Sequence, residues 1–124
     1  MANRDVRLVL WSLNNFRGRR IIIRRGGVAA RDLGAFRFDN ALSSFRLRNV
    51  VNAREVTLVL FSRTNFRGNF RVFRGNRSVA NLSTTNFNNV TSSFILVGRV
   101  LTDAQINQIR STGTPPQDIV IIRQ

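Results

Sequence analysis

Trp11-Ser12-Leu13-Asn14-Asn15-Phe16-Arg17-Gly18 recurs 50 positions later as Phe61-Ser62-Arg63-Thr64-Asn65-Phe66-Arg67-Gly68. Each copy has an aromatic residue, four intervening residues, a second aromatic residue, any residue and a glycine. The duplication extends further, because Ser43-Ser44-Phe45 recurs at an offset of 49 as Ser92-Ser93-Phe94. Internal repeats define the structural unit. Two copies predict one closed domain built from two equivalent units.

Each unit contains segments typical of β-strands, either because they are rich in β-branched residues or, as in residues 44–48, because apolar and charged residues alternate with period two. The clearest are Val6–Trp11, Arg19–Ile23 and Ser44–Arg48 in the first unit, and Val56–Phe61, Phe70–Phe73 and Ser93–Val97 in the second. The long connection between Val28 and Phe38 has room for a short third strand. About four strands with a long return connection indicate a Greek key, and two Greek keys indicate an all-β sandwich. In each unit one strand alternates arginine with apolar residues, so arginines are expected on the outer sheet faces and Phe, Ile and Leu inside.

The segment from Val100 to Gln124 has no counterpart in either repeat. Thr102-Asp103-Ala104-Gln105 forms a capping box, which predicts a short helix from Asp103 to about Arg110 with Ile106 and Ile109 facing inward. Gly113 ends this helix, and residues 118–123 are predicted to form one more strand. The predicted organisation is a domain over residues 1–99, with Greek keys at about 4–49 and 54–99, and a C-terminal extension over 100–124 packed on it. The alternative is that the extension pairs with a second molecule, so both a monomer and a dimer remain open.

Composition narrows the classes of function. The 124 residues include no Cys, His, Tyr or Lys, and no two of the six carboxylates are close in sequence, so acid–base catalysis has few groups available and no enzyme is expected. No apolar run reaches the roughly 18–20 residues that span a membrane, and no signal-peptide core is present. We therefore expect a cytoplasmic or non-classically exported protein, and the compartment itself stays open.

Two oxygen-rich strings lie at matching places in the two units. They read Asp39-Asn40-Ala41-Leu42-Ser43-Ser44 and Asn88-Asn89-Val90-Thr91-Ser92-Ser93. Each has two Asp or Asn residues, two variable residues and two serines. Oxygen ligands at a tight turn suit a hard cation such as Ca²⁺.

Taken together, these motifs resemble the βγ-crystallin superfamily, and specifically its microbial calcium-binding members, over about residues 4–99. The resemblance implies two Greek keys that clamp two calcium ions, with both oxygen-rich strings contributing to the sites. By resemblance, the ligands are the main-chain carbonyls of Ser12 and Ser62, carbonyl or side-chain oxygens of Asp39, Asn40, Ala41, Asn88, Asn89 and Val90, and the hydroxyls of Ser43 and Ser92. The atom that each Asp or Asn uses stays open.

The charge of the chain favours a second function. All 20 basic residues are arginine and the net charge is +14. This charge attracts polyanions. Two features oppose tight calcium binding: the net charge repels a dication, and the two strings contain only one carboxylate, Asp39. We expect calcium affinity in roughly the 10⁻⁵ to 10⁻³ M range. The alternative is an arginine-rich module for polyanions or nucleic acid on the same scaffold, although the phenylalanines lie at core-periodic positions rather than at positions suited to base stacking.

Overall fold

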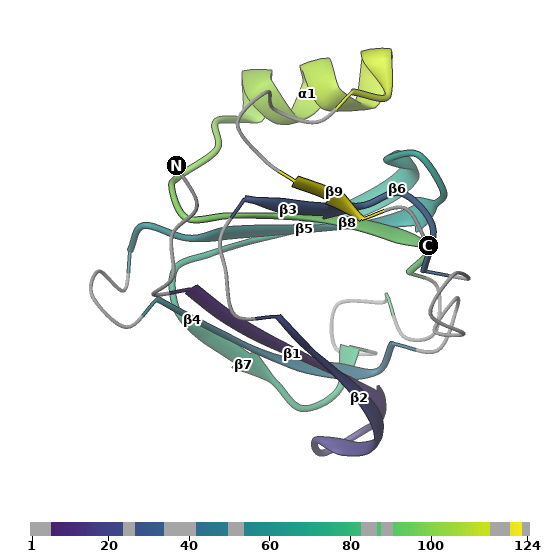
Figure 1. Ribbon diagram of the computed structural model, residues 1–124, viewed down its shortest axis with the longest axis vertical. Coiled ribbons are helices and arrows are strands. Elements are labelled where there is room, and N and C mark those ends of the chain that lie inside the picture. The colour runs from purple at the N-terminus through teal and green to yellow at the C-terminus, as the bar shows by residue number, and fades with distance from the viewer. Residues whose placement is uncertain are drawn as a thin grey trace.

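The computed structural model describes residues 6–23, 27–33, 42–49, 54–82, 87, 91–114 and 120–122. It is an all-β sandwich of two sheets, with one helix lying on the outer side of one of them (Figure 1). In chain order the elements are β1 (Val6–Leu13), β2 (Arg17–Ile23), β3 (Val28–Ala30), β4 (Ser44–Asn49), β5 (Thr57–Arg63), β6 (Arg67–Arg74), β7 (Arg77–Val79), β8 (Ser93–Val97), α1 (Asp103–Thr112) and β9 (Val120–Ile122). The predicted sandwich with a short C-terminal helix and an extra strand is confirmed.

Each sheet contains strands of both repeats. The four-stranded sheet has the order β2-β1-β4-β7 and the five-stranded sheet has the order β6-β5-β8-β3-β9. Strand β3 of the first repeat pairs with β8, with Ala29 opposite Ile95, and β7 of the second repeat pairs with β4, with Ser78 opposite Arg46. The third strand of each unit therefore crosses to the sheet of the other unit. This exchange joins the two repeats into one domain.

The duplicated aromatic–glycine motif forms the hairpins β1–β2 and β5–β6. Gly18 and Gly68 have φ values of +86° and +83°, which glycine adopts without strain. A Cβ atom at Gly18 would collide with the hydroxyl of Ser12, and one at Gly68 would collide with the hydroxyl of Ser62. Glycine is therefore required at this position of both hairpins, because the chain folds back onto the serine.

The main core lies between the two sheets. It includes Leu8, Leu10 and Phe45 from the four-stranded sheet and Leu58 and Phe94 from the five-stranded sheet, all fully or almost fully buried. Strands β1 and β4 alternate buried with exposed or half-buried residues over most of their length, as expected for a sheet with one wet face. Strand β8 is buried at every residue, and β5 over its first five residues. The five-stranded sheet is thus covered on both faces.

Helix α1 provides the second cover (Figure 1). Its buried residues Ile106 and Ile109 join a second apolar cluster with Val59, Phe61 and Ile95. The predicted capping box at Thr102 and the predicted stop at Gly113 are both present, and the helix runs two residues past Arg110. Strand β9 extends the edge of the same sheet by pairing in parallel with β3. Among the described residues, no helix has the length and apolar character needed to cross a membrane.

The prediction that arginines line both outer faces is wrong for the five-stranded sheet. In β6 the pairing places Phe70 opposite Phe61 and Arg71 opposite Leu60. Phe70 and Val72 therefore point toward helix α1 and pack on its cluster. Arg71 instead lies on the inner side, with its guanidinium 4.9 Å from the centre of the Phe87 ring. The outer face of this sheet packs against a helix and therefore has to be apolar. For this reason the apolar residues of β6 point outward and Arg71 points inward, the opposite of what was expected.

Candidate calcium sites

The structure places the predicted serines at two equivalent corners of the sandwich. We define the first corner by Ser12, Ser43 and residues 80–82, and the second corner by Ser62, Ser92 and residues 31–33. Each corner combines a hairpin and a serine of one repeat with the third-strand end of the other repeat. Whether both oxygen-rich strings contribute to each site stays a prediction, because residues 39–41 and 88–90 lie outside the described residues.

At the first corner the backbone of Ser43 is fixed on both sides. Its amide donates to the carbonyl of Trp11 at 2.9 Å, and its carbonyl accepts from the amide of Leu82 at 2.9 Å. The Ser43 hydroxyl donates to the carbonyl oxygen of Ser12 at 3.2 Å. Two predicted ligand atoms, the Ser12 carbonyl and the Ser43 hydroxyl, are therefore brought together.

The second corner repeats the backbone hydrogen bonds of this arrangement. The amide of Ser92 donates to the carbonyl of Phe61 at 2.8 Å, and the carbonyl of Ser92 accepts from the amide of Leu33 at 2.8 Å. The Ser62 hydroxyl accepts from the amide of Asn69 at 2.8 Å, as the Ser12 hydroxyl accepts from Arg19 at 2.9 Å. The serine hydroxyl at position 12 or 62 thus serves the hairpin and leaves its carbonyl as the candidate ligand.

Two further backbone hydrogen bonds connect each hairpin to the other repeat. The amide of Asn15 donates to the carbonyl of Ala80 at 2.8 Å, and the amide of Asn65 donates to the carbonyl of Arg31 at 2.9 Å. Asn15 and Asn65 have φ values near +60°, a conformation that asparagine tolerates better than most residues. The hairpin tips are therefore held firmly at both corners.

The second serine of each string has a role that sequence reasoning missed. The Ser44 hydroxyl donates to the carbonyl of Leu13 at 2.7 Å and accepts from the amide of Phe16 at 3.1 Å. The Ser93 hydroxyl makes the same two bonds with Arg63 and Phe66, at 2.6 and 3.1 Å. These bonds stabilise the left-handed backbone of the two phenylalanines, whose φ values are 59° and 61°. Ser44 and Ser93 thus have a structural reason to be present that does not involve a metal.

Arg31 is a second residue that sequence reasoning did not single out. Its guanidinium donates to the carbonyl of Gly113 at 2.9 Å and to the side-chain oxygen of Asn65 at 3.4 Å, and it lies 5.2 Å from the centre of the Phe66 ring. It connects the second corner to the C-terminal end of helix α1. The counterpart of Arg31 in the second repeat is Ala80, so the repeat alignment shows the difference but not the contact.

Six of the ten predicted ligand residues lie outside the described residues: Asp39, Asn40, Ala41, Asn88, Asn89 and Val90. The donors that are described suit calcium, since they are carbonyl and hydroxyl oxygens. Two oxygens bound to one Ca²⁺ at about 2.4 Å and at about a right angle lie about 3.4 Å apart. The separation of the Ser12 and Ser43 oxygens, 3.2 Å, is close to this value.

The second string contains a buried polar atom at Thr91. Among the described residues, no hydrogen-bond partner is found for the Thr91 hydroxyl. Its counterpart in the first repeat is Leu42, which is fully buried in the core. Within the described ranges no group of three or more His, Cys, Asp or Glu side chains comes together. A metal at either corner would therefore depend on backbone and hydroxyl oxygens together with the Asp and Asn residues of the strings.

Comparison with known proteins gives the fold a name. No protein-family model matches the sequence, and no curated protein matches it. Solved structures do match. One of them is a structure described as 'Evolution of the eye lens beta-gamma-crystallin domain fold', which is 21% identical in sequence with a TM-score of 0.64. The match covers 76% of this chain and 87% of that structure's chain.

Two further structures agree with this match. A βγ-crystallin from Ciona intestinalis is 17% identical with a TM-score of 0.57, covering 72% of this chain and 96% of its own. A βγ-crystallin domain from Clostridium beijerinckii is 11% identical with a TM-score of 0.56, covering 74% of this chain and 98% of its own. All three cover close to the share of the chain that the two repeats occupy. The duplicated sandwich therefore has the βγ-crystallin domain fold.

Proposed function

We propose that this protein is a non-enzymatic calcium-binding domain of the βγ-crystallin type, with one calcium site at each corner. The observation that carries the proposal is the approach of the Ser12 carbonyl and the Ser43 hydroxyl to 3.2 Å, at a corner where both repeats meet. The equivalent fixation of Ser92 by Phe61 and Leu33 supports a second site related to the first by the duplication.

The corners are also where an ion would matter most for stability. Each corner joins a hairpin of one repeat to the third-strand end of the other, so a ligand bound there favours the closed two-repeat domain over the unfolded chain. The resident ion would be held by the carbonyls of Ser12 and Ser62, the hydroxyls of Ser43 and Ser92, and the Asp and Asn oxygens of the two strings. Calcium at about 100 times its dissociation constant would add about 2.7 kcal/mol of stability per site.

The experiment is a thermal melt and an isothermal titration with Ca²⁺, each compared with the same protein in EGTA. Ser43→Ala and Ser92→Ala each remove one hydroxyl ligand while keeping the backbone hydrogen bonds of the serine. We expect calcium to raise the melting temperature of each variant by less than that of the unaltered protein, because one site is lost. In EGTA each variant should keep most of its stability.

Ser44→Ala is the matched control. It removes a neighbouring hydroxyl that belongs to the hairpin, so it should lower stability in EGTA and leave the calcium-dependent increment in place. If millimolar calcium changes neither the melting temperature nor the emission of Trp11 in the unaltered protein, the calcium proposal is wrong.

A further inference from the structure

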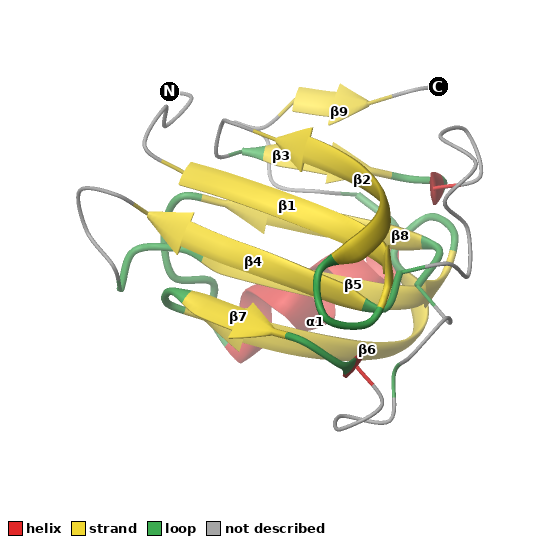
Figure 2. Ribbon diagram, turned by 90° about the horizontal axis from the view of Figure 1, so that it is seen from below, coloured by secondary structure: helices red, strands yellow, loops and turns green. Residues whose placement is uncertain are grey.

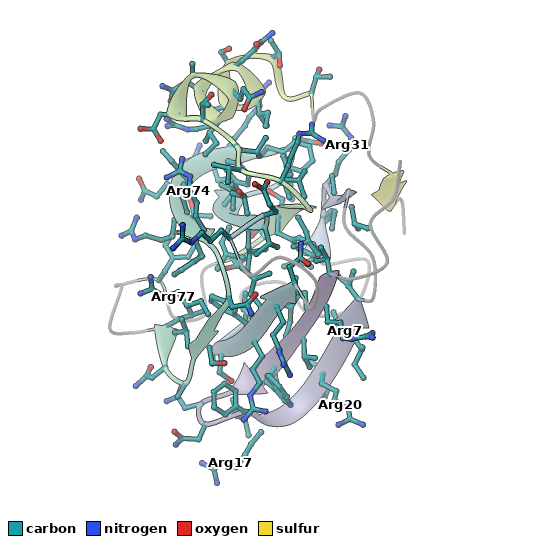
Figure 3. All side chains as sticks on the ribbon, turned by 90° about the vertical axis from the view of Figure 1, so that its left-hand side faces the viewer. Arg7, Arg17, Arg20, Arg31, Arg74 and Arg77 are labelled. Atoms are coloured by element: carbon teal, nitrogen blue, oxygen red, sulfur yellow. The ribbon has the colours of Figure 1, made fainter. Side chains whose placement is uncertain are left out.

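The two outer faces of the sandwich differ in charge. We call the outer face of the four-stranded sheet the cationic face and define it by Arg7 on β1, Arg20 on β2, and Arg46 and Arg48 on β4. All four side chains are exposed. Figure 2 looks onto this face, with β2, β1, β4 and β7 in front and helix α1 behind them. Figure 3 shows Arg7 and Arg20 on this sheet, directed away from the helix.

The internal duplication identifies the residues that occupy the equivalent positions on the other sheet, under helix α1 and the segment before it. At the positions of Arg7, Arg20, Arg46 and Arg48 the second repeat has Thr57, Phe70, Ile95 and Val97. Thr57, Ile95 and Val97 are buried, and Phe70 packs against the cluster under helix α1. Each of these four positions therefore carries an exposed arginine in the first repeat and a covered side chain in the second. The cationic face is a specific difference between the repeats rather than a general feature of the fold.

The described strands of this face carry no carboxylate. The ion pair found among the described residues, Arg74 with Asp103 at 2.9 Å, lies on the other sheet. Arg7 and Arg48 stand directly opposite each other on neighbouring strands. Like charges in such a pair destabilise a sheet. A bound anion would remove this repulsion, and bidentate phosphate groups match the guanidinium geometry.

The face also has an aromatic platform, although the phenylalanines were expected at core-periodic positions rather than at positions suited to base stacking. Trp11 and Phe16 are half-buried here, with ring centres 5.2 Å apart in an edge-to-face arrangement. The Arg46 guanidinium lies 4.5 Å from the centre of the Phe16 ring and 6.0 Å from that of Trp11. Their counterparts Phe61 and Phe66 are fully buried under helix α1. Proteins that bind single-stranded nucleic acid combine arginines with partly exposed aromatic rings in this way.

We propose that the cationic face binds single-stranded nucleic acid, with Arg7, Arg20, Arg46 and Arg48 contacting phosphates and Trp11 and Phe16 contacting bases. Four strands spaced about 4.8 Å apart make a face about 14 Å wide before side chains are added. This is too wide to enter a major groove of about 12 Å, so a duplex can contact the face only through its backbone. Two copies of the chain are not expected to pair through this face, because two such faces would repel each other.

The test measures fluorescence anisotropy of a fluorescein-labelled oligothymidylate in EGTA, so that its result is independent of calcium. Four phosphate contacts on a single strand predict an affinity that falls about 50-fold between about 50 and 200 mM salt. The double variant Arg7→Thr/Arg48→Thr removes two of the four arginines. Threonine is chosen because Thr57 is the counterpart of Arg7 in the second repeat. This variant should weaken binding at low salt and reduce the fall over the same range to about 7-fold. The emission of Trp11 should be quenched by the oligonucleotide in the unaltered protein.

Arg63→Thr/Arg67→Thr is the matched control. These arginines also face each other across a hairpin and are exposed, but they lie on the five-stranded sheet. The control removes the same charge and should keep the salt dependence of the unaltered protein. An equal loss in both double variants would show that net charge alone is responsible and would overturn the proposal. Duplex DNA or heparin binding as tightly as the single strand without quenching Trp11, or binding to anionic vesicles but not to the oligonucleotide, would also overturn it.

Discussion

Phe16 and Phe66 occupy the same position in the two hairpins but have different surroundings. Phe66 is fully buried, with its ring 5.7 Å from that of Phe61 and the Arg31 guanidinium over its face. Phe16 is half-buried on the open cationic face and touches Trp11 and Arg46. The same substitution, phenylalanine to alanine, should therefore have different costs at the two positions.

The burial of each ring sets the magnitude. Truncating a fully buried phenylalanine costs about 3–5 kcal/mol, because the ring loses its burial and leaves a cavity. Phe16 has roughly half of that burial and leaves no enclosed cavity, so its truncation should cost about 1–2 kcal/mol. Both residues have a left-handed backbone, and alanine keeps that strain at both positions, so the difference reflects packing.

Urea denaturation followed by far-ultraviolet circular dichroism measures this difference. Trp11 emission is unsuitable, since Trp11 touches Phe16. With an m value of about 2 kcal/mol/M, Phe66→Ala should lower the urea midpoint by about 2 M and Phe16→Ala by about 0.5–1 M. Equal shifts at the two positions would refute the reasoning, because they would mean that helix α1 adds nothing to the burial of Phe66.

Three further predictions follow from the same features. Deleting residues 100–124 should uncover the apolar face of the five-stranded sheet, and differential scanning calorimetry should show a lower melting temperature together with new binding of the dye ANS; an unchanged melt would show that the extension is passive. Gly68→Ala should destabilise the protein by at least about 1–2 kcal/mol, since a Cβ there meets the Ser62 hydroxyl at a φ of +83°, and a urea midpoint equal to that of the unaltered protein would contradict this. Asp39→Asn should weaken calcium binding in a titration more than Asn88→Ala does, because it removes the carboxylate of the two strings; the reverse order would mean that carbonyl ligands dominate.

The hairpins were predictable because their requirements are local. Gly18 and Gly68 are required because the hairpin needs a positive φ at this position. A Cβ there would also collide with the serine of the same hairpin, Ser12 or Ser62. The helix was predictable for the same reason, since Thr102 and Gln105 form its cap and Gly113 ends it. The pairing of Ser12 with Ser43 across 31 residues was not predicted. The family resemblance named both serines as ligands without assigning either to a particular ion, and local chemistry does not place the two together.

The sequence by itself determined the duplication, the strand periodicity, the hairpin turns and the oxygen-rich strings, because each of these depends on residues close together in the chain. Tertiary structure decided which face of each sheet meets water. Arg46 and Ile95 occupy equivalent positions, and only the docking of helix α1 explains why one is exposed and the other buried. It also decided the strand exchange that closes both corners and the direction of Arg71. These outcomes depend on which elements pack on each other over long separations, and period-two patterns do not specify the partner.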